Sequence, residues 1–553
     1  MEKIRFFTLG GNDEHGKNSS VIEIDQEIYV VDAGVRYPES SEVLGVEIII
    51  PDFTYLIENK NRIKAIFITH GHDDVMGALP YLLKDVRIPV YTTPLTSLMI
   101  KDVLQEHKIK NVEIHEIKRS GQFKIGKRSI RTFGLTHSIP DTFGIAIDTD
   151  QGYIVHSSEF VIDFDAKGES FSCDISDLAE IGKKGVFILT VESITADKSG
   201  FTSPTHRISS RIDRVFEESE GRIFTTLYDQ NIYRLIEVVE MAKKYRRRVF
   251  FANESQRKIL NHLDKLGYYK IPKEVEVSPE HFNNKMDNVV VIVSNTGPDV
   301  FRSMHRIASG EDARIKLDPK DTVIIASPIV PGTERVAAAM EDELFKDGVR
   351  VVSLNYREVS AMHASIEDIK MMLSMMKPKY YVPLKGSYLN LIKNADIAFD
   401  MDFLAKNVVV LDNGEVATFE NGNHIESFEK VALDEVLIDG KDNLDTSSLV
   451  LRDRKTLATD GAIIAGLVID HKTKEIIGGP DVQSRGVIYI RSSENIMNEV
   501  GHILERTVEK ARKENRFDNV AVRNDARDQI SKYVFKETGK RPMVMPVIIE
   551  VNL

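Results

Sequence analysis

Two histidines and two aspartates stand close together at residues 70–75, which read His-Gly-His-Asp-Asp-Val. The preceding run 65–69, Ala-Ile-Phe-Ile-Thr, is β-branched and aromatic and predicts a short buried strand. A loop that leaves such a strand can present His70 and His72 on one side, with Asp74 two residues further on. Two imidazoles and a carboxylate at this spacing suit a Zn²⁺ or Mn²⁺ ion that keeps an open position for water. A polar loop without a metal fits this stretch alone equally well.

Length and composition indicate a multidomain globular protein. The chain has 553 residues, of which 29% are charged and 42% apolar, and single hydrophobic cores stop growing near ~250–300 residues. The one cysteine, Cys173, excludes an internal disulfide framework and a zinc site of several cysteines. No apolar run approaches the ~20 residues that span a bilayer, and the N-terminus lacks a signal-peptide pattern. We therefore expect a cytoplasmic protein without membrane contact.

The formal net charge of −12 argues against a polyanion binder whose whole surface is basic. It does not exclude RNA held in a local basic channel. The densest basic cluster lies at residues 243–248, which read Lys-Lys-Tyr-Arg-Arg-Arg. We interpret this cluster as the solvated end of a helix.

The pattern of apolar residues changes character along the chain. The first two hundred residues predict short strands with helices and turns between them, which favours two sheets carrying helices on their outer faces. After about residue 205, helices alternate with strands, as in a separate and largely parallel α/β domain. Strands and a helix return from about 350 to 445. A last unit follows, with strands predicted at 462–469, 486–490 and 543–551 and helices at 494–515 and 524–537.

Further motifs follow one another in a fixed order along the chain. They are Leu9-Gly10-Gly11, Gly16-Lys17-Asn18, Val31-Asp32-Ala33-Gly34, Thr136-His137-Ser138, Ser157-Ser158-Glu159-Phe160, Asn231 with Arg234, Pro331-Gly332, His363-Ala364-Ser365, Lys377-Pro378-Lys379-Tyr380, Leu451-Arg452-Asp453-Arg454 and Arg541-Pro542. Together with residues 70–75, this series resembles the ribonuclease J family, the bacterial β-CASP metallo-β-lactamase ribonucleases, over essentially the whole chain. The altered motifs described below are similar to those expected of a catalytically weakened second paralogue.

The resemblance implies an α/β fold with a discontinuous layout. A metallo-β-lactamase αββα sandwich would be formed by residues 1–205 and 350–445, with a β-CASP α/β domain inserted at 206–349. A small C-terminal α/β domain at 446–553 would assist dimerisation.

The resemblance also implies an activity. In the family, two metal ions activate a water that attacks the RNA phosphodiester. Family members act as 5′→3′ exonucleases, some also as endonucleases, in RNA maturation and decay, and they favour RNA with a 5′-monophosphate.

Carried over by resemblance, one metal site would use His70, His72 and His137, with Glu159 as a bridging carboxylate. The family has aspartate at the position of Glu159, so the carboxylate here sits one methylene further out.

The second metal site of the resemblance has lost ligands. It would use Asp74 and the bridging acid, but Val75 replaces one histidine and Lys385 replaces another. An ammonium group has no lone pair to offer a metal, and its charge repels one. We therefore expect at most one Zn or Mn ion per chain. Lys385 either places a fixed positive charge where the second cation would lie or is a neutral substitution without a function. The sequence does not distinguish these two alternatives.

The resemblance assigns substrate binding to the loop that begins at residue 359. Its members are Val359, Ser360, Ala361, Met362, His363 and Ser365. Met362 replaces a glycine that would let the backbone approach phosphate closely. Asp74 and His363 are the residues for which the resemblance implies a catalytic role.

The sequence therefore predicts a ribonuclease of weak intrinsic activity that acts on RNA with a 5′-monophosphate. It would work as a homodimer, as a hetero-oligomer with an active paralogue, or as both. The alternative is a non-catalytic protein that stabilises or steers its ribonuclease partner. A metallo-β-lactamase hydrolase of small esters or thioesters is the third possibility, against which the long insertion and the C-terminal domain argue.

Overall fold

The computed structural model describes residues 1–38, 45–166, 168–330, 332–354, 359, 361–439, 442–444, 449–487 and 493–552. These residues form two compact units. The first comprises Met1–Glu39 with Glu47–Gly440, and the second comprises Ser40–Val46 with Lys441–Leu553. The predicted boundaries inside the first unit stay predictions.

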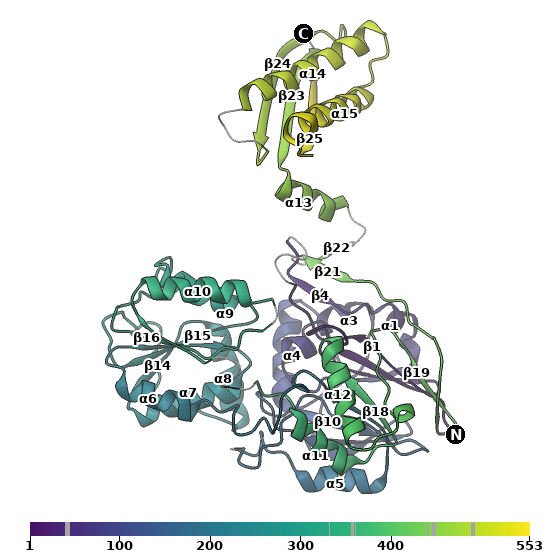
Figure 1. The fold of residues 1–553 in the computed structure, drawn as a ribbon, viewed down its shortest axis with the longest axis vertical. Helices are drawn as coiled ribbons and strands as arrows, with labels where there is room; N and C mark the ends of the chain where they lie inside the picture. The colour runs from purple at the N-terminus through teal and green to yellow at the C-terminus, as the bar shows by residue number, and fades with distance from the viewer. Residues whose placement is uncertain are drawn as a thin grey trace. The chain divides into compact units, whose positions relative to one another are not determined.

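Two mixed sheets form the centre of the first unit (Figure 1). The larger has the order β20 (Asn423–Ile425), β19 (Ala417–Glu420), β1 (Ile4–Gly10), β2 (Ser19–Ile24), β3 (Glu27–Val31), β5 (Ile63–Phe67), β6 (Val90–Thr92), β7 (Ile114–Glu116). The smaller has the order β18 (Tyr380–Leu384), β12 (Val186–Glu192), β11 (Tyr153–His156), β10 (Phe143–Ile147), β9 (Arg128–Gly134), β8 (Gly121–Ile125).

Both sheets are buried on their two faces. Along β3, Tyr29 and Val31 belong to the core between the sheets, whereas Ile28 and Val30 belong to the outer core, as the period-2 alternation of a strand requires. The outer core of the larger sheet is closed by α3 (Leu79–Asp85) and α4 (Pro94–Glu106). That of the smaller sheet is closed by α5 (Ile175–Lys184), α11 (Ile366–Met376) and α12 (Tyr388–Asp400). The αββα layering expected from the sequence is thereby confirmed.

A third sheet is formed by strands that lie between Ile223 and Ser353 in the sequence. Its order is β14 (Arg248–Phe251), β15 (Val289–Asn295), β13 (Ile223–Tyr228), β16 (Thr322–Ile325), β17 (Arg350–Ser353), and every neighbouring pair is parallel. Helices α6 (Ser209–Glu218), α7 (Ile232–Lys244) and α8 (Glu254–Leu266) cover one face, and α9 (Asp299–Ala308) and α10 (Glu334–Lys346) cover the other (Figure 1). The prediction of a parallel α/β insertion is therefore confirmed.

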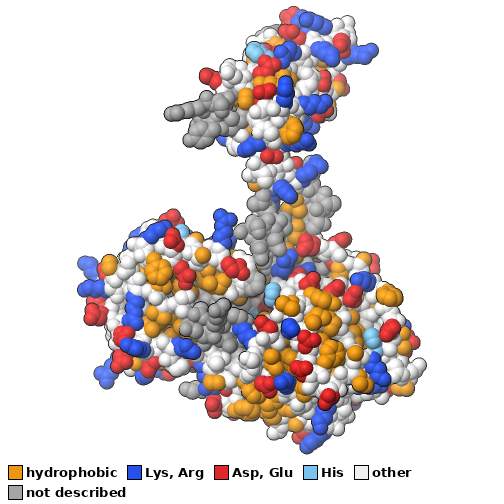
Figure 2. Space-filling view, viewed as in Figure 1, with side chains coloured by type: hydrophobic (Ala, Val, Ile, Leu, Met, Phe, Trp, Pro, Cys, Tyr) orange, Lys and Arg blue, Asp and Glu red, His pale blue; other side chains and the backbone are white. Residues whose placement is uncertain are grey.

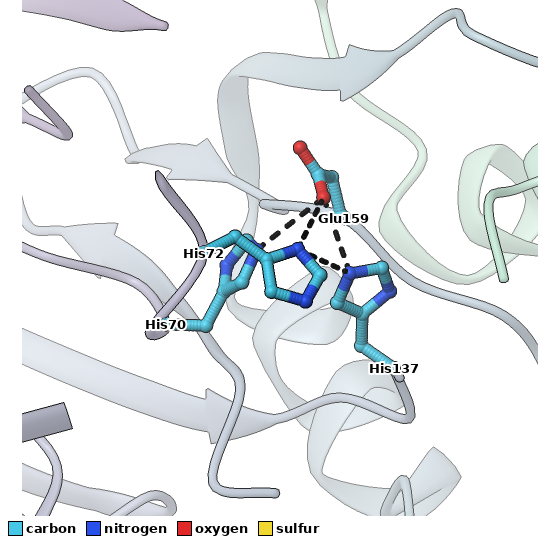
Figure 3. Close-up of side chains that lie close together, drawn as sticks. All are labelled: His70, His72, His137 and Glu159. Carbon is cyan, nitrogen blue, oxygen red and sulfur yellow. Dashed lines mark hydrogen bonds and ion pairs between the residues drawn. The ribbon is translucent and has the colours of Figure 1, made fainter. Parts of the chain in front are cut away.

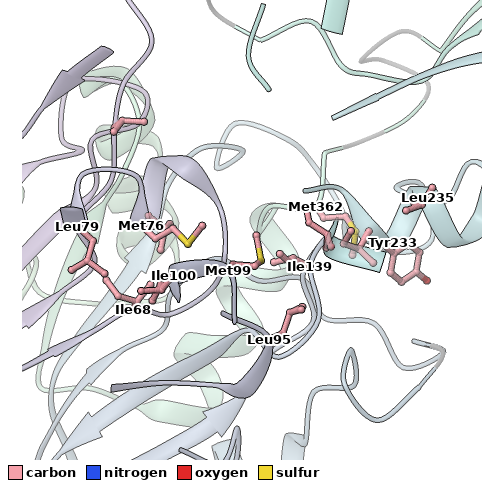
Figure 4. Close-up of a cluster of buried hydrophobic side chains, with 14 of the residues drawn as sticks. Ile68, Met76, Leu79, Leu95, Met99, Ile100, Ile139, Tyr233, Leu235 and Met362 are labelled. Carbon is pink, nitrogen blue, oxygen red and sulfur yellow. The ribbon is translucent and has the colours of Figure 1, made fainter. Parts of the chain in front are cut away.

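The insertion and the sandwich share part of one hydrophobic core. Tyr233 and Leu235 of α7 belong to the same buried cluster as Ile139, Met362 and Met99, which lie in or beside the sandwich (Figure 4). Separating the two parts would expose this apolar surface to water, which is unfavourable by about 25 cal/mol for each Å².

The second unit is a small sheet covered by two helices. Strand β23 (Ala462–Asp470) lies between β24 (Ile476–Arg485) and β25 (Met543–Val551). Helices α14 (Ser493–Lys513) and α15 (Asn519–Thr538) contribute to a core with β23 and β25. The unit also contains α13 (Leu449–Thr459).

One predicted strand of this unit is misplaced. The prediction put a strand at 486–490, but the strand ends at Arg485, and residues 488–490 lie outside the described part of the chain. The segment 476–485 contains Gly478, Gly479 and Pro480, which argue against a strand in the sequence. These residues are tolerated because β24 is an edge strand of the sheet.

The basic cluster at 243–248 begins in the last turn of α7 and ends at Arg248, the first residue of β14. Lys243, Lys244 and Arg246 are exposed, as the sequence indicated, but Arg247 is buried. Lys243 pairs with Glu240 at 2.9 Å, and the Arg247 guanidinium donates to the Gly221 carbonyl at 2.7 Å. On the visible face of the first unit, acidic and basic side chains are interspersed (Figure 2). None of the helices in the described ranges is long and apolar enough to cross a membrane.

A buried ion pair joins β13 to β16 and yields a stability prediction. Arg222 donates from Nη2 to Asp321 Oδ2 at 2.6 Å, and both side chains are almost fully buried. Arg222→Met would leave the Asp321 carboxylate buried without its partner, so we expect the free energy of unfolding to fall by about 3–5 kcal/mol. Chemical denaturation measures this change. In the control Arg214→Met, which removes an exposed ion pair with Glu218, the midpoint should stay unchanged; equal effects of the two variants would contradict the prediction.

Candidate metal centre

Strand direction brings the candidate residues to one edge of the sandwich. Strands β9 and β11 both run antiparallel to β10, and β12 and β18 continue parallel to β11. Their carboxyl ends therefore meet at the same edge. His137 follows β9, Glu159 follows β11 and Lys385 follows β18 directly. His70 follows β5 of the facing sheet.

Four of the predicted ligands converge on one point (Figure 3). Glu159 Oε2 lies 3.3 Å from His70 Nε2, 3.2 Å from His137 Nε2 and 3.9 Å from His72 Nδ1. His72 Nδ1 lies 3.4 Å from His137 Nε2. Three imidazole nitrogens and one carboxylate oxygen thus face one another across a small gap.

The spacing and chemistry of this cluster fit one metal ion. Ligand atoms at about 2.0–2.1 Å from a tetrahedral zinc lie about 3.3–3.4 Å apart, close to most of the separations found here. Among the described residues, His70 Nε2 and Glu159 Oε2 are buried and have no hydrogen-bond partner. Buried polar atoms are normally satisfied, so a cation accounts for both. The described residues support a metal-binding site without fixing the metal.

Hydrogen bonds at the far side of each ring set the tautomers. His137 Nδ1 donates to the Met362 carbonyl at 2.7 Å, which leaves the lone pair on Nε2. Thr69 Oγ1 donates to Asp32 Oδ1 at 2.9 Å, so it accepts from His70 Nδ1 at 3.1 Å. His70 Nε2 is then also free to bind a metal.

The third ring is oriented in the same way. His72 Nε2 lies 3.0 Å from Ser138 Oγ, which leaves Nδ1 directed at the cluster. Burial lowers the pKa of His70 to about 4 and holds the pKa of His72 well below its ordinary value. Both imidazoles are therefore neutral at pH 7 and keep the lone pair that a metal needs.

Lys385 approaches Glu159 from the opposite side. Its Nζ lies 3.2 Å from Glu159 Oε1 and 3.6 Å from Asp32 Oδ2, and its side chain is 6% exposed. Although burial opposes the charged forms, the ion pair raises the pKa of Lys385 and holds the pKa of Glu159 well below its usual range. At Asp32, burial raises the pKa more than the Lys385 ammonium lowers it, so the pKa is raised to about 6.

The second predicted ligand set is not assembled. Asp74 lies outside the four-atom cluster, and its Oδ2 accepts a hydrogen bond from Asn18 Nδ2 at 2.9 Å. Burial raises the pKa of Asp74 above its ordinary value, and the Glu159 carboxylate adds to this shift. Val75 is fully buried in the outer core of the larger sheet. It offers no ligand.

The stretch predicted as a loop contains one helical turn, α2 (Asp73–Met76), which begins after His72. Asp73 joins this turn to the inserted α/β part of the unit. Gln230 Nε2 donates to Asp73 Oδ1 at 2.7 Å, and the Asp73 backbone N–H donates to Gln230 Oε1 at 3.2 Å. Tyr37 OH donates to Asp73 Oδ2 at 2.9 Å.

His363 is held by a buried carboxylate. Its Nδ1 lies 2.7 Å from Glu192 Oε2, and Glu192 Oε1 accepts from the backbone N–H groups of Phe160 and Ala364 at 2.8 and 3.1 Å. Burial opposes the charge, but the Glu192 carboxylate raises the pKa of His363 to about 9. The ring of His363 lies 5.6 Å from that of His137, centroid to centroid.

The remaining predicted substrate-binding residues differ in their surroundings. Ala361, Met362 and His363 line the cavity beside the cluster of candidate metal ligands. Ser365 instead caps α11, where its hydroxyl pairs with Thr202 Oγ1 at 2.6 Å. Val359 is buried. Ser360 lies outside the described residues.

A cavity of about 640 Å³ runs from the cluster of candidate metal ligands to the inserted part of the unit. Its acidic lining residues are Asp73, Asp74, Glu159, Asp197, Asp229 and Glu334. Among the described residues that line it, Arg234 is the one lysine or arginine, and its guanidinium donates to the Ala326 carbonyl at 2.7 Å. Polyanion binding relies on basic side chains, so this lining is unfavourable for tight RNA binding.

Sequence reasoning gave no role to three residues of the site. Asp32 and Asn18 belong to motifs that were noticed, but nothing in the sequence showed that they contact Lys385 and Asp74. Glu192 was missed altogether. Its signal is an acid at the end of the apolar run Val186–Glu192, where a buried carboxylate needs partners.

Comparisons with known proteins agree with the geometry. Family models match at residues 12–142 (metallo-beta-lactamase superfamily), 220–344 (ribonuclease J, beta-CASP domain) and 449–551 (ribonuclease J C-terminal domain). Proteins named Ribonuclease J 2 from Staphylococcus epidermidis and Staphylococcus aureus are each 34% identical over 550 residues, which cover 99% of this chain and 98% of the relative.

A solved structure shares the fold. It is a crystal structure of a protein of unknown function from Enterococcus faecalis, with a TM-score of 0.51 and 14% identity. The alignment covers 75% of this chain and all of the other chain.

The ligand geometry generates a prediction about metal content. After equilibration with Zn²⁺ or Mn²⁺ and desalting, the protein should retain at most one ion per chain, because one set of lone pairs converges. His137→Ala should reduce this content, whereas His115→Ala, which changes a partly exposed histidine on β7, should not. Elemental analysis measures the content. Two stoichiometric ions in anomalous scattering, both bound by these residues, would contradict the prediction.

Proposed function

We propose, from the premise that this chain belongs to the ribonuclease J family, that it is a weak 5′→3′ exoribonuclease working beside an active paralogue. Family membership supports a metal-dependent ribonuclease. The convergence of three imidazoles on Glu159, with Lys385 on its other oxygen, is the observation that carries the proposal of weak activity.

One ion supplies part of the chemistry of phosphodiester hydrolysis. When bound, it would polarise a phosphoryl oxygen and lower the pKa of a water molecule. The residues of the chain do the rest. His70, His72 and His137 present lone pairs from fixed rings, and Glu159 offers Oε2 beside them. The substrate we propose is RNA with a 5′-monophosphate.

His363 is the proposed proton donor and phosphate contact. It lines the cavity, and the Glu192 carboxylate stabilises its charged form. An imidazolium can donate a hydrogen bond to a phosphate oxygen or a proton to the leaving oxygen. Asp74, held by Asn18, faces the same cavity and is the second proposed catalytic group.

A non-catalytic partner protein is the second candidate function. The acidic lining of the cavity and the loss of a second ligand set favour it. The two candidates differ in a single measurable property, cleavage of RNA that depends on the metal ligands. In either case, we propose roles in ribosomal RNA processing and messenger RNA decay in the cytoplasm, and for the catalytic candidate we include endonuclease cleavage in the proposal.

The first prediction from this proposal concerns turnover. A site with one cation loses stabilisation of either the attacking or the leaving oxygen, which costs several kcal/mol and hence orders of magnitude in rate. We expect slow Mn²⁺-dependent decay of a 5′-monophosphorylated RNA in single-turnover assays. His72→Ala should reduce it further, and the control His115→Ala should not.

Two outcomes would change this conclusion. Turnover equal to that of a family member with a complete ligand set would show that the count of ligands is wrong. Absence of cleavage above the level of His72→Ala would favour the non-catalytic candidate.

The second prediction concerns assembly, for which the second unit provides a surface. Side chains of β23 and β25 alternate between a buried face and an exposed one. The exposed apolar side chains on these two strands are Ile464, Met545, Val547 and Ile549, of which Ile549 is 52% exposed. A self-complementary apolar sheet face suits a twofold dimer, so we propose that this unit mediates homodimers and association with the paralogue.

Truncation after about residue 445 should abolish dimers and association with the paralogue while the first unit stays folded, because each unit has a core of its own. Ile549→Lys should weaken the dimer by burying a charge. Val520→Lys, at a position on α15 that is 59% exposed, serves as the control. Light scattering that shows an unchanged oligomer after truncation would refute the proposal.

A further inference from the structure

Glu159 has two oxygens with different neighbours. Oε2 faces the three imidazole nitrogens, and Oε1 lies 3.2 Å from Lys385 Nζ. The carboxylate is fully buried, so both contacts lie in surroundings of low dielectric constant. It therefore bridges a metal position on one side and an ammonium on the other.

We propose that the Lys385 ammonium is the resident second cation of this centre, standing in for a second metal ion and excluding it. This inference deepens the proposed function and rests on it only for the metal-binding site. Its tests measure bound metal and stability, so it can fail without the ribonuclease proposal failing, and the reverse also holds.

Charge balance is the first argument. Asp32 and Glu159 are buried, Asp74 lies beside them half-buried, and isolated buried carboxylates are strongly unfavourable. Lys385 lies against two of them, at 3.2 Å from Glu159 and 3.6 Å from Asp32. It supplies the positive charge that a metal would otherwise bring.

Coordination chemistry is the second argument. An ammonium donates three hydrogen bonds but has no lone pair. A divalent ion placed between Glu159 Oε1 and Asp32 Oδ2 would meet the ammonium at a few ångströms, where like charges in a buried site repel strongly. Val75, fully buried in the apolar core, adds no ligand. The described residues therefore do not fit a second ion.

The backbone around Lys385 is the third argument. Its φ of 62° lies in the left-handed region, which a lysine rarely adopts. The conformation is fixed by neighbours: the Lys385 N–H donates to Asn12 Oδ1 at 3.1 Å, and the Gly386 N–H donates to the Gly11 carbonyl at 3.0 Å. The start of the side chain is thus held in place by the loop after β1, as a positioned group requires.

The test compares wild-type protein with Lys385→Met, which removes the charge at similar volume, and with Lys385→His, which adds a lone pair. Lys17→Met is the matched control. Lys17 is also largely buried and pairs with a carboxylate, Glu14, at 3.2 Å. Bound Mn²⁺ is counted by elemental analysis, and melting temperature is measured in EDTA and in excess Mn²⁺.

Wild type and Lys17→Met should bind one ion at most. In EDTA, Lys385→Met should melt several degrees below wild type, because its carboxylates lose their cation. Mn²⁺ should restore this loss and raise the bound metal by one ion per chain, since carboxylate oxygens suit Mn²⁺. Lys385→His should likewise gain one ion.

Three results would overturn the proposal. A second ion bound to the wild-type centre would show that the ammonium excludes nothing. Lys385→Met that is as stable as wild type in EDTA would show that the charge is not needed. If Lys385→Met loses stability without gaining an ion, Lys385 has a structural role only. If Lys385→Met does not fold, Lys385→His prepared with Mn²⁺ decides, and no more bound ions there than in wild type counts against the proposal.

Discussion

The split contact of Glu159 is the interaction on which the rest of the site depends. One buried carboxylate faces three imidazole nitrogens at Oε2 and one ammonium at Oε1. Each partner is fixed from behind, the imidazoles by Met362, Thr69 and Ser138. Removing the carboxylate would leave lone pairs facing one another and a cation without its strongest partner, so strands from both sheets converge on this one side chain.

The candidate metal ligands were predictable because they follow strands in motifs that resemble those of a known family. His70, His72, His137 and Glu159 were all named from the sequence, and the structure brings them together. What a sequence cannot supply is which oxygen of a carboxylate faces which partner. The position of Lys385 between Glu159 and Asp32 depends on the pairing of β12 with β18, which are nearly two hundred residues apart in the sequence.

The same reasoning explains where the fold was and was not predictable. Short apolar runs rich in β-branched residues, such as 289–293 and 322–325, favour buried parallel strands. Strand β24 carries two glycines and a proline, and it exists because β23 pairs with it, a tertiary effect that local patterns do not contain. Ser365 was assigned to substrate binding by its motif, but its hydroxyl caps the N-terminus of α11.

The paired hydrogen bonds between Asp73 and Gln230 have a thermodynamic consequence. Asp73 stands between the candidate ligand His72 and Asp74, while Gln230 lies two residues before α7 of the inserted part. The ordering of the turn at Asp73–Met76 and the packing of the insertion against the sandwich are therefore coupled equilibria. The coupling is reciprocal. If a bound cation stabilises the packed position of the insertion, that packed position increases the affinity for the cation by the same free energy.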